Sequence, residues 1–182
     1  MPVDRTPAEI VGFWREAGPE RWFTKDAGFD AELRARFEAA HHGAARRELD
    51  AWSDNAEGAL ALCLLLDQIP RNVYRGSAHA FATDTLAIAA ADRAIERGHD
   101  QTTPIPLRIF FYLPFEHAEN MALQQSCVRL FEAAGDAGFL NYAILHRDII
   151  ARFGRFPHRN AALGRTSTPE ERAFLNSGGF AG

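Results

Sequence analysis

Residues 121–153, MALQQSCVRLFEAAGDAGFLNYAILHRDIIARF, contain the clearest structural pattern in the chain. Apolar side chains recur there at i, i+4, i+7, i+8 and i+11, the spacing of one face of an α-helix: Leu123, Cys127, Leu130, Phe131 and Ala134. A second apolar stripe follows and ends before Gly154: Phe139, Tyr142, Ala143, Ile149, Ile150 and Phe153. The stretch predicts two consecutive amphipathic helices.

Helix signals continue outward to both ends of the chain. Thr6-Pro7-Ala8-Glu9 and Thr168-Pro169-Glu170-Glu171 are capping boxes with proline at the first helical position. No segment is typical of a strand, and no linker divides the sequence. We therefore predict an all-α fold, an antiparallel stack of about 8–9 helices in a single domain over residues 1–182.

Several helix boundaries can be predicted between these ends. Apolar residues from Phe29 to Ala40 indicate a helix that is interrupted near Gly43. The cluster at residues 53–55, Ser-Asp-Asn, can cap a largely buried helix to Ile69. Ser77 should open the next long helix, which Gly98 closes.

The composition limits the class of protein. The chain has 182 residues, 47% hydrophobic and 24% charged, with a net charge of -4, which argues against a disordered chain and a generic nucleic-acid binder. The longest apolar run, residues 59–66, is too short for a membrane span, which takes about 20 residues. The first five residues have no secretory pattern, and Cys63 and Cys127 are typical of small buried side chains. We expect a cytoplasmic protein without membrane or nucleic-acid partners.

Three apolar-proline pairs, at residues 69–70, 113–114 and 156–157, are each followed by polar side chains. Each proline is expected to end a helix, because it has no N–H and restrains the preceding residue. One helix separates each pair from the next, so antiparallel packing would place the three corners at the same pole.

The same corners resemble a known family. The segments LLDQIPRNVYRG (65–76), FFYLP with Glu116, His117 and Glu119 (110–119), and HRDIIARFGRFPHRN with LGR (146–165) are similar to the bacterial domain-of-unknown-function 924 family. Trp22-Phe23 and Phe29-Asp30 fit the same pattern. The resemblance implies a tetratricopeptide-like helical arrangement, no established activity and no catalytic residues. Phe115-Glu116 departs from the apolar pair usual there.

Residues 146–165 contain five arginines and one acidic residue, Asp148, in a chain of net charge -4. Guanidinium groups suit bidentate contact with carboxylate or phosphate oxygens. The same arginines could instead pair with neighbouring acids, and the i, i+4 spacing of Asp148 and Arg152 on a helix would allow one such pair. Both interpretations, an anion site and a structural ion-pair network, follow from this segment.

Histidines add a second feature to these corners. His146 lies on the apolar stripe of its helix, where a histidine is more often a hydrogen-bonded core residue than a catalyst. His117 and His158 would have to lie nearby for a functional role. The sequence has no HExxH, paired ExxH or cysteine-pair spacing, so we expect neither metal nor cofactor.

Two functions remain open. The first is a binding module with an Arg/His-lined pocket for an anionic group of a small molecule or peptide, with a protein partner as another possibility. The alternative is an enzyme acting on a small anionic metabolite, with His117 or His146 as acid or base, oriented by Glu119 or Asp148. The residues expected to line the site are Arg71, Asn72, Arg75, His117, Glu119, His146, Arg155, His158, Arg159 and Asn160.

Overall fold

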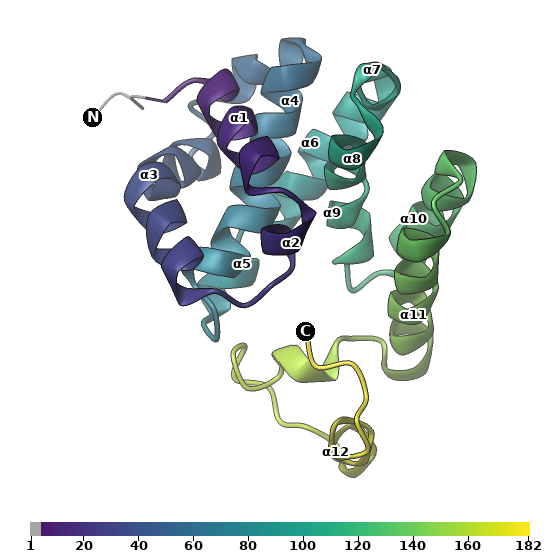
Figure 1. Ribbon diagram of the computed structural model, residues 1–182. Coiled ribbons are helices and arrows are strands. Elements are labelled where there is room, and N and C mark those ends of the chain that lie inside the picture. Colours follow the sequence, from purple (N-terminus) through teal and green to yellow (C-terminus); the bar gives the residue numbers. More distant parts are fainter. Residues whose placement is uncertain (1–4) are drawn as a thin grey trace. The chain divides into compact units, whose positions relative to one another are not determined.

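The structure, a computed structural model, describes residues 5–182 (Figure 1). These residues form helices, turns and loops and include no strand, so the predicted all-α class is confirmed. They divide into two compact units. The first consists of Met1–Arg75, as far as it is described, and His79–Pro114, and the second of Gly76–Ala78 and Phe115–Gly182. The single domain and the tetratricopeptide-like arrangement stay predictions.

The first unit contains most of the helices. They are α1 (Pro7–Ala17), α2 (Pro19–Trp22), α3 (Ala27–Ala45), the 3-10 helix η1 (Asp50–Asp54), α4 (Ala56–Cys63), the π-helical turn η2 (Leu64–Gln68), α5 (Ile69–Val73), α6 (Asp84–Glu96), α7 (His99–Thr102), α8 (Ile105–Arg108) and the 3-10 helix η4 (Ile109–Phe111). The short 3-10 helix η3 (Ala78–Phe81) begins at the boundary and has His79 in this unit.

The second unit is built on a helical hairpin. Its helices are α10 (Met121–Ala134) and α11 (Ala137–Phe153), which pack together and are joined by two residues. The hairpin confirms the two amphipathic helices predicted from residues 121–153. The short helix α9 (Leu113–Glu116) precedes the hairpin in the chain, and the boundary between the two units falls within it. The 3-10 helix η5 (Pro157–Arg159) and α12 (Pro169–Asn176) follow the hairpin.

Helix starts were predicted well where the signal is local. The side chains of Thr6 and Thr168 each accept a hydrogen bond from the backbone N–H of a glutamate three residues later. The side chain of that glutamate accepts from the backbone N–H of the threonine, so both capping boxes are present. Asn55 caps α4 through the backbone N–H of Gly58.

Cys63 and Cys127 are both buried, and burial raises the pKa of both thiols.

Two boundary predictions are wrong. The helix expected to open at Ser77 begins at Asp84, after η3, and α3 continues through Gly43 to Ala45. In each case the helix boundary lies a few residues after the residue that was expected to mark it.

The prediction that prolines end three helices is also wrong. Pro70 lies at the second position of α5, which continues directly from α4 and η2, and Pro114 lies inside α9. The third helix, α11, ends at Gly154, which has a positive φ of 69°, and Pro157 opens η5 three residues later.

Long-range contacts explain why the helix continues through Pro70. Pro70 gives no N–H to the preceding turn, and the carbonyls of that turn accept side-chain donors instead. The Leu65 carbonyl lies 2.8 Å from Nδ1 of His41, and the Leu66 carbonyl accepts from Oγ1 of Thr83 at 2.6 Å. These partners come from α3 and from the residue before α6.

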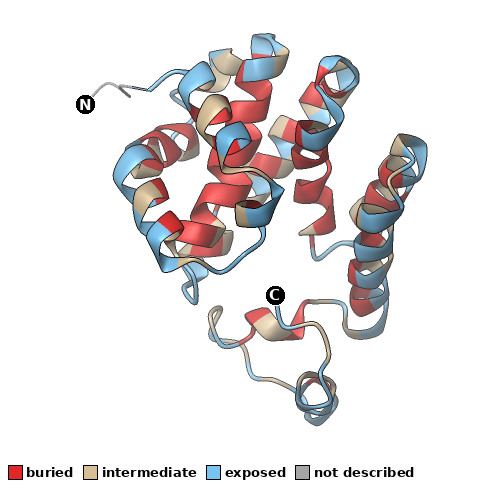
Figure 2. Ribbon diagram, viewed as in Figure 1, coloured by how far each residue is buried: buried red, intermediate tan, exposed pale blue. Residues whose placement is uncertain are grey.

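The helix from α4 to α5 forms the centre of the first unit. Every residue from 58 to 70 is buried, and Figure 2 shows this segment as a continuous red ribbon. Helices α1, α3 and α6 pack against it. None of the helices in residues 5–182 combines the length and the apolar character needed to cross a membrane.

Candidate functional site

The ten residues expected to line the site fall into both units. Arg71, Asn72 and Arg75 belong to the first unit. The second unit contains the other seven: His117, Glu119, His146, Arg155, His158, Arg159 and Asn160. We therefore describe the two groups separately.

In the first unit the predicted residues bind neighbouring acids. Nη1 of Arg71 lies 3.0 Å from Oδ1 of Asp67 and 2.9 Å from Oδ1 of Asp84. Arg75 makes a bidentate contact with Asp30, at 2.6 and 3.1 Å. These pairs join the α5 segment to α3 and α6. In the first unit the arginines therefore belong to a structural ion-pair network.

Asn72 completes this corner. Its side-chain amide donates to Oδ1 of Asp30 at 2.9 Å, and the residue is buried. Asp30 thus accepts from two residues of the α5 segment and fixes its C-terminal end against α3.

In the second unit the side chain of Glu119 binds two positions of residues 146–165, Phe156 and Arg165. It accepts from the backbone N–H of Phe156 at 2.8 Å and from Arg165 at 2.6 and 2.9 Å. Burial raises the pKa of Glu119, but the hydrogen bonds from Arg165 and Phe156 outweigh it and lower the pKa below its usual value. Glu119 is therefore an ionised structural acceptor.

Arg155 and Asn160 meet at one buried carboxylate, Glu171. Arg155 contacts both oxygens of Glu171, at 2.6 and 2.9 Å, and the Asn160 amide donates to one of them at 3.1 Å. The hydrogen bonds from Arg155 and from the Thr168 backbone lower the pKa of Glu171 to about 2. This network fixes α12 to the segment that follows α11.

The three histidines of the second unit gather around Phe156. The rings of His117 and His146 lie 6.5 Å apart, and the centroid of Phe156 is 5.4 Å from His146 and 5.6 Å from His158. Phe156 is fully buried and has the guanidinium of Arg159 over its ring at 4.4 Å. We call His117, His146 and His158 the second-unit histidine cluster.

The segment after α12 packs onto this cluster. The ring of Phe180 lies 4.6 Å from His146 and 5.4 Å from His158, in edge-on contacts. Phe180 also packs against the small apolar core of Ile149, Ile150 and Phe156. The cluster therefore contacts an aromatic side chain on non-helical backbone.

The pKa of His158 is strongly lowered. Burial is the main cause, and the charge of Arg159 and the proximity of His146 and His117 add to it, so that the pKa falls to about 3. Its Nδ1 atom is buried and has no hydrogen-bond partner among residues 5–182. At neutral pH this imidazole is uncharged.

His146 is held by its own helix. Its Nδ1 atom lies 2.8 Å from the Tyr142 carbonyl and 3.6 Å from Oε1 of Glu116. The carboxylate beside His146 is thus Glu116, while Glu119 binds Arg165 and Asp148 binds Arg147. Glu119 and Asp148, the acids expected to orient a catalytic histidine in the enzyme alternative, therefore bind arginines.

The first unit contains two features that the sequence analysis missed. One is a group of three histidines, His41, His42 and His79, whose potential ligand atoms lie within 4.8 Å of one another. The adjacent pair His41-His42 near the end of α3 was the available signal, but nothing local connects it to His79.

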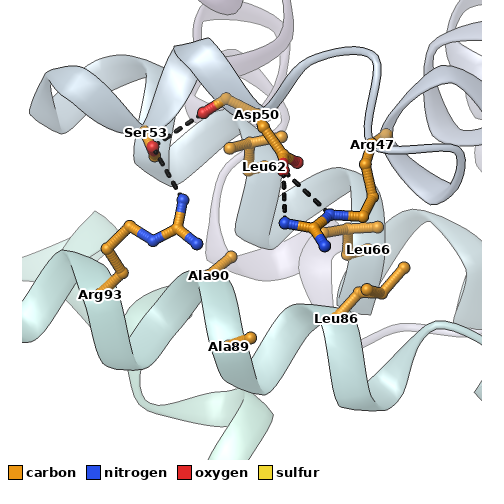
Figure 3. Close-up of a pocket in the computed structure, with 10 residues that line it drawn as sticks. Arg47, Asp50, Ser53, Leu62, Leu66, Leu86, Ala89, Ala90 and Arg93 are labelled. Carbon is orange, nitrogen blue, oxygen red and sulfur yellow. Dashed lines mark hydrogen bonds and ion pairs between the residues drawn. The ribbon is translucent and has the colours of Figure 1, made fainter.

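The other feature is a cavity of about 120 Å³ beside η1, α4 and α6 (Figure 3). Its polar side is closed by Arg47 with Asp50 and by Arg93 with Ser53. Its remaining lining is apolar: Ala44, Leu62, Leu66, Leu86, Ala89 and Ala90. None of the ten predicted site residues lines it.

Comparisons with known proteins agree with the resemblance in the sequence. The family model described as bacterial protein of unknown function DUF924 matches residues 10–179. The chain belongs to the DUF924 family. A solved structure, that of the protein of unknown function ATU0120 from Agrobacterium tumefaciens, is 56% identical, with a TM-score of 0.91. That match covers 94% of this chain and 97% of the other.

Membership in DUF924 assigns no chemistry to the residues above, since the family description and the solved neighbour both state an unknown function. No curated protein matches the chain. The function of this DUF924 protein has to be argued from its own side chains.

Proposed function

We propose that the protein is a binding module, and that the second-unit histidine cluster binds a ligand with an aromatic ring and an anionic group, either a small molecule or a peptide. The observation that supports this most is the electrostatic setting of His158, whose pKa is lowered to about 3 by burial and by the charge of Arg159. Of these causes only the positive charge of Arg159 favours a carboxylate or phosphate, because burial disfavours a charge of either sign.

Ion pairs with carboxylates hold several arginines of residues 146–165. The pairs are Arg147–Asp148, Arg152–Glu170, Arg155–Glu171 and Arg165–Glu119. We assign the anionic contact to Arg159 because of its position in the cluster, where its buried guanidinium lies over Phe156 and acts electrostatically on His158.

The aromatic part of the ligand would take the place of Phe180. That ring is half-buried and contacts His146 and His158 edge-on. Imidazole and phenyl edges and faces attract one another in this geometry, which favours an aromatic side chain over an aliphatic one of equal size. Phe180 would then compete with the ligand.

The test uses phenylacetate and phenyl phosphate as probes, with acetate and inorganic phosphate for comparison. Binding is followed by the imidazole NMR signals of the full-length protein. We expect saturable shifts at His158 and His146 with the aromatic anions, and tighter binding in Phe180→Ala, which removes the competing ring.

Arg159→Gln should weaken that binding about tenfold or more, since a hydrogen bond to a charged group contributes about 1.5–3 kcal/mol. The matched control is Arg129→Gln, an exposed arginine on α10. Equal losses in both variants, or no shift of any cluster histidine, would refute the proposal.

The enzyme alternative is favoured by one observation, the setting of His146. Its Nδ1 atom faces the Tyr142 carbonyl, with Oε1 of Glu116 at 3.6 Å, so the neutral ring has its lone pair on Nε2. That tautomer suits a general base. Turnover of simple phosphate or carboxylate esters that His146→Asn abolishes and His99→Asn preserves would support it, whereas saturable binding without turnover supports the module.

A further inference from the structure

His41, His42 and His79 of the first unit form a compact triangle of imidazoles. Their ring centroids lie 5.1 Å (His41–His42), 5.5 Å (His41–His79) and 5.6 Å (His42–His79) apart. His41 is fully buried, while His42 and His79 are half-buried. The triangle lies where the last turn of α3 meets η3.

The fold determines which nitrogen of His41 is available. Its Nδ1 atom is 2.8 Å from the Leu65 carbonyl, which can only accept, so Nδ1 has the proton and donates. The lone pair is then on Nε2, which lies 3.4 Å from Nε2 of His79. A ring N–H directed to a backbone carbonyl is the usual support of a metal-binding histidine.

The distance between the two Nε2 atoms fits a shared ion. Two nitrogens bound at about 2.0–2.1 Å to one tetrahedral zinc ion lie roughly 3.4 Å apart.

Tyr74 fixes the other two rings. Its hydroxyl is 2.9 Å from Oε1 of Glu38 and 3.1 Å from Nε2 of His42. The hydroxyl donates to Glu38, because a carboxylate oxygen accepts. His42 then donates from Nε2 to Tyr74, which leaves Nδ1 as its metal-binding nitrogen.

The Tyr74 ring also stacks on His79, with centroids 3.9 Å apart and planes 2° from parallel. Each of the three imidazoles is therefore oriented by another group: His41 by a carbonyl, His42 by a hydroxyl and His79 by a ring. Three imidazoles held together in this way place their potential ligand atoms within 4.8 Å of one another.

We propose that His41, His42 and His79 form a binding site for a divalent transition metal of the zinc class. Three imidazole nitrogens suit zinc, and they leave one position of a tetrahedral ion for water or an external ligand. The half-buried positions of His42 and His79 leave that side accessible. The proposal is independent of the anion site proposed for the second unit.

The experiment is a calorimetric titration of the chelator-stripped, full-length protein with Zn²⁺. We expect one equivalent to bind, and Co²⁺ to give the visible absorption of a tetrahedral complex. His79→Ala and His42→Ala should each weaken binding by more than about 100-fold, because the loss of an outer partner alone costs about 10–100-fold. His99→Ala, outside the triangle, is the matched control and should bind as the natural protein does.

Tyr74→Phe tests the supporting contacts without removing a ligand. It retains the ring that stacks on His79 and deletes only the hydroxyl between His42 and Glu38, so we expect about 10–100-fold weaker binding in a folded protein. Absence of saturable Zn²⁺ binding, unchanged affinity in the variant with both His42 and His79 replaced, or loss of binding in His117→Ala instead would overturn the proposal.

Discussion

The two units each contain a cluster of three histidines, and the clusters differ in what their rings face. In the first unit, nitrogen faces nitrogen, with Nε2 of His41 and of His79 3.4 Å apart. In the second unit the rings of His146 and His158 face Phe156 and Phe180. Among residues 5–182 only the first cluster brings three potential metal ligands within 4.8 Å of one another.

The difference shows that the groups next to the imidazoles decide their chemistry. A backbone carbonyl or a hydroxyl fixes a tautomer and directs the opposite nitrogen outward. An aromatic ring or a guanidinium instead excludes water and opposes protonation, as at His158. We therefore expect the first cluster to respond to metal ions and the second to pH and anions.

The largest expected effect concerns the support beneath the second cluster. Glu171→Gln would leave the guanidinium of Arg155 without its carboxylate partner, and Glu171 is almost fully buried. Removing one member of a buried ion pair costs about 3–5 kcal/mol. Chemical denaturation should show this loss in the free energy of unfolding.

Glu9→Gln is the matched control for that variant, because Glu9 occupies the same capping-box position in α1 but is exposed. Its loss in the free energy of unfolding should be clearly smaller than that of Glu171→Gln, because Glu9 is exposed to water and Gln can also complete a capping box. Similar losses for the two glutamates would mean that the Arg155–Glu171 pair contributes little to the second unit.

A smaller effect per pH unit is expected from acidification. The pKa of His158 is about 3 when folded, against an ordinary value of 6.5, so only the unfolded chain binds this proton between those values. The contribution of His158 is present above pH 6.5 and is lost as pH falls towards 3, by about 1.4 kcal/mol per pH unit. His158→Phe should flatten this part of the stability profile.

His99→Phe is the control for the pH experiment, since His99 lies in the first unit. The profile of that variant should keep the slope of the natural protein between pH 6.5 and 4. An unchanged slope in His158→Phe would show that this imidazole is protonated in the folded state, contrary to the distinction between the two clusters.

Sequence reasoning succeeded for structures whose causes lie within a few residues. The capping boxes at Thr6 and Thr168 and the stripes of residues 121–153 are local, and each is present. The same reasoning identified the charged segment 146–165 but not its partners, because Glu171 lies 16 residues from Arg155 and Glu119 lies 46 from Arg165.

The histidine triangle was missed for the same physical reason. His41 and His79 are 38 residues apart, and only the packing of η3 against α3 brings them together. The continuation of the helix through Pro70 depends on contacts with His41 and Thr83, which lie far away in the chain. A proline's effect on a helix can be predicted locally, but the donors that compensate for it cannot.

The smallest effect we expect links Pro70 to the first cluster. Alanine at this position restores a backbone N–H that can bind the carbonyls of the preceding turn, including that of Leu65, and so competes with Nδ1 of His41. The ring would be less well oriented, and Zn²⁺ affinity should fall about tenfold while global stability changes by about 1 kcal/mol. Pro114→Ala, inside α9, is the control for a proline replaced elsewhere and should leave Zn²⁺ affinity unchanged. If Pro70→Ala binds Zn²⁺ as tightly as the natural protein, the Leu65 carbonyl orients His41 without help from the proline.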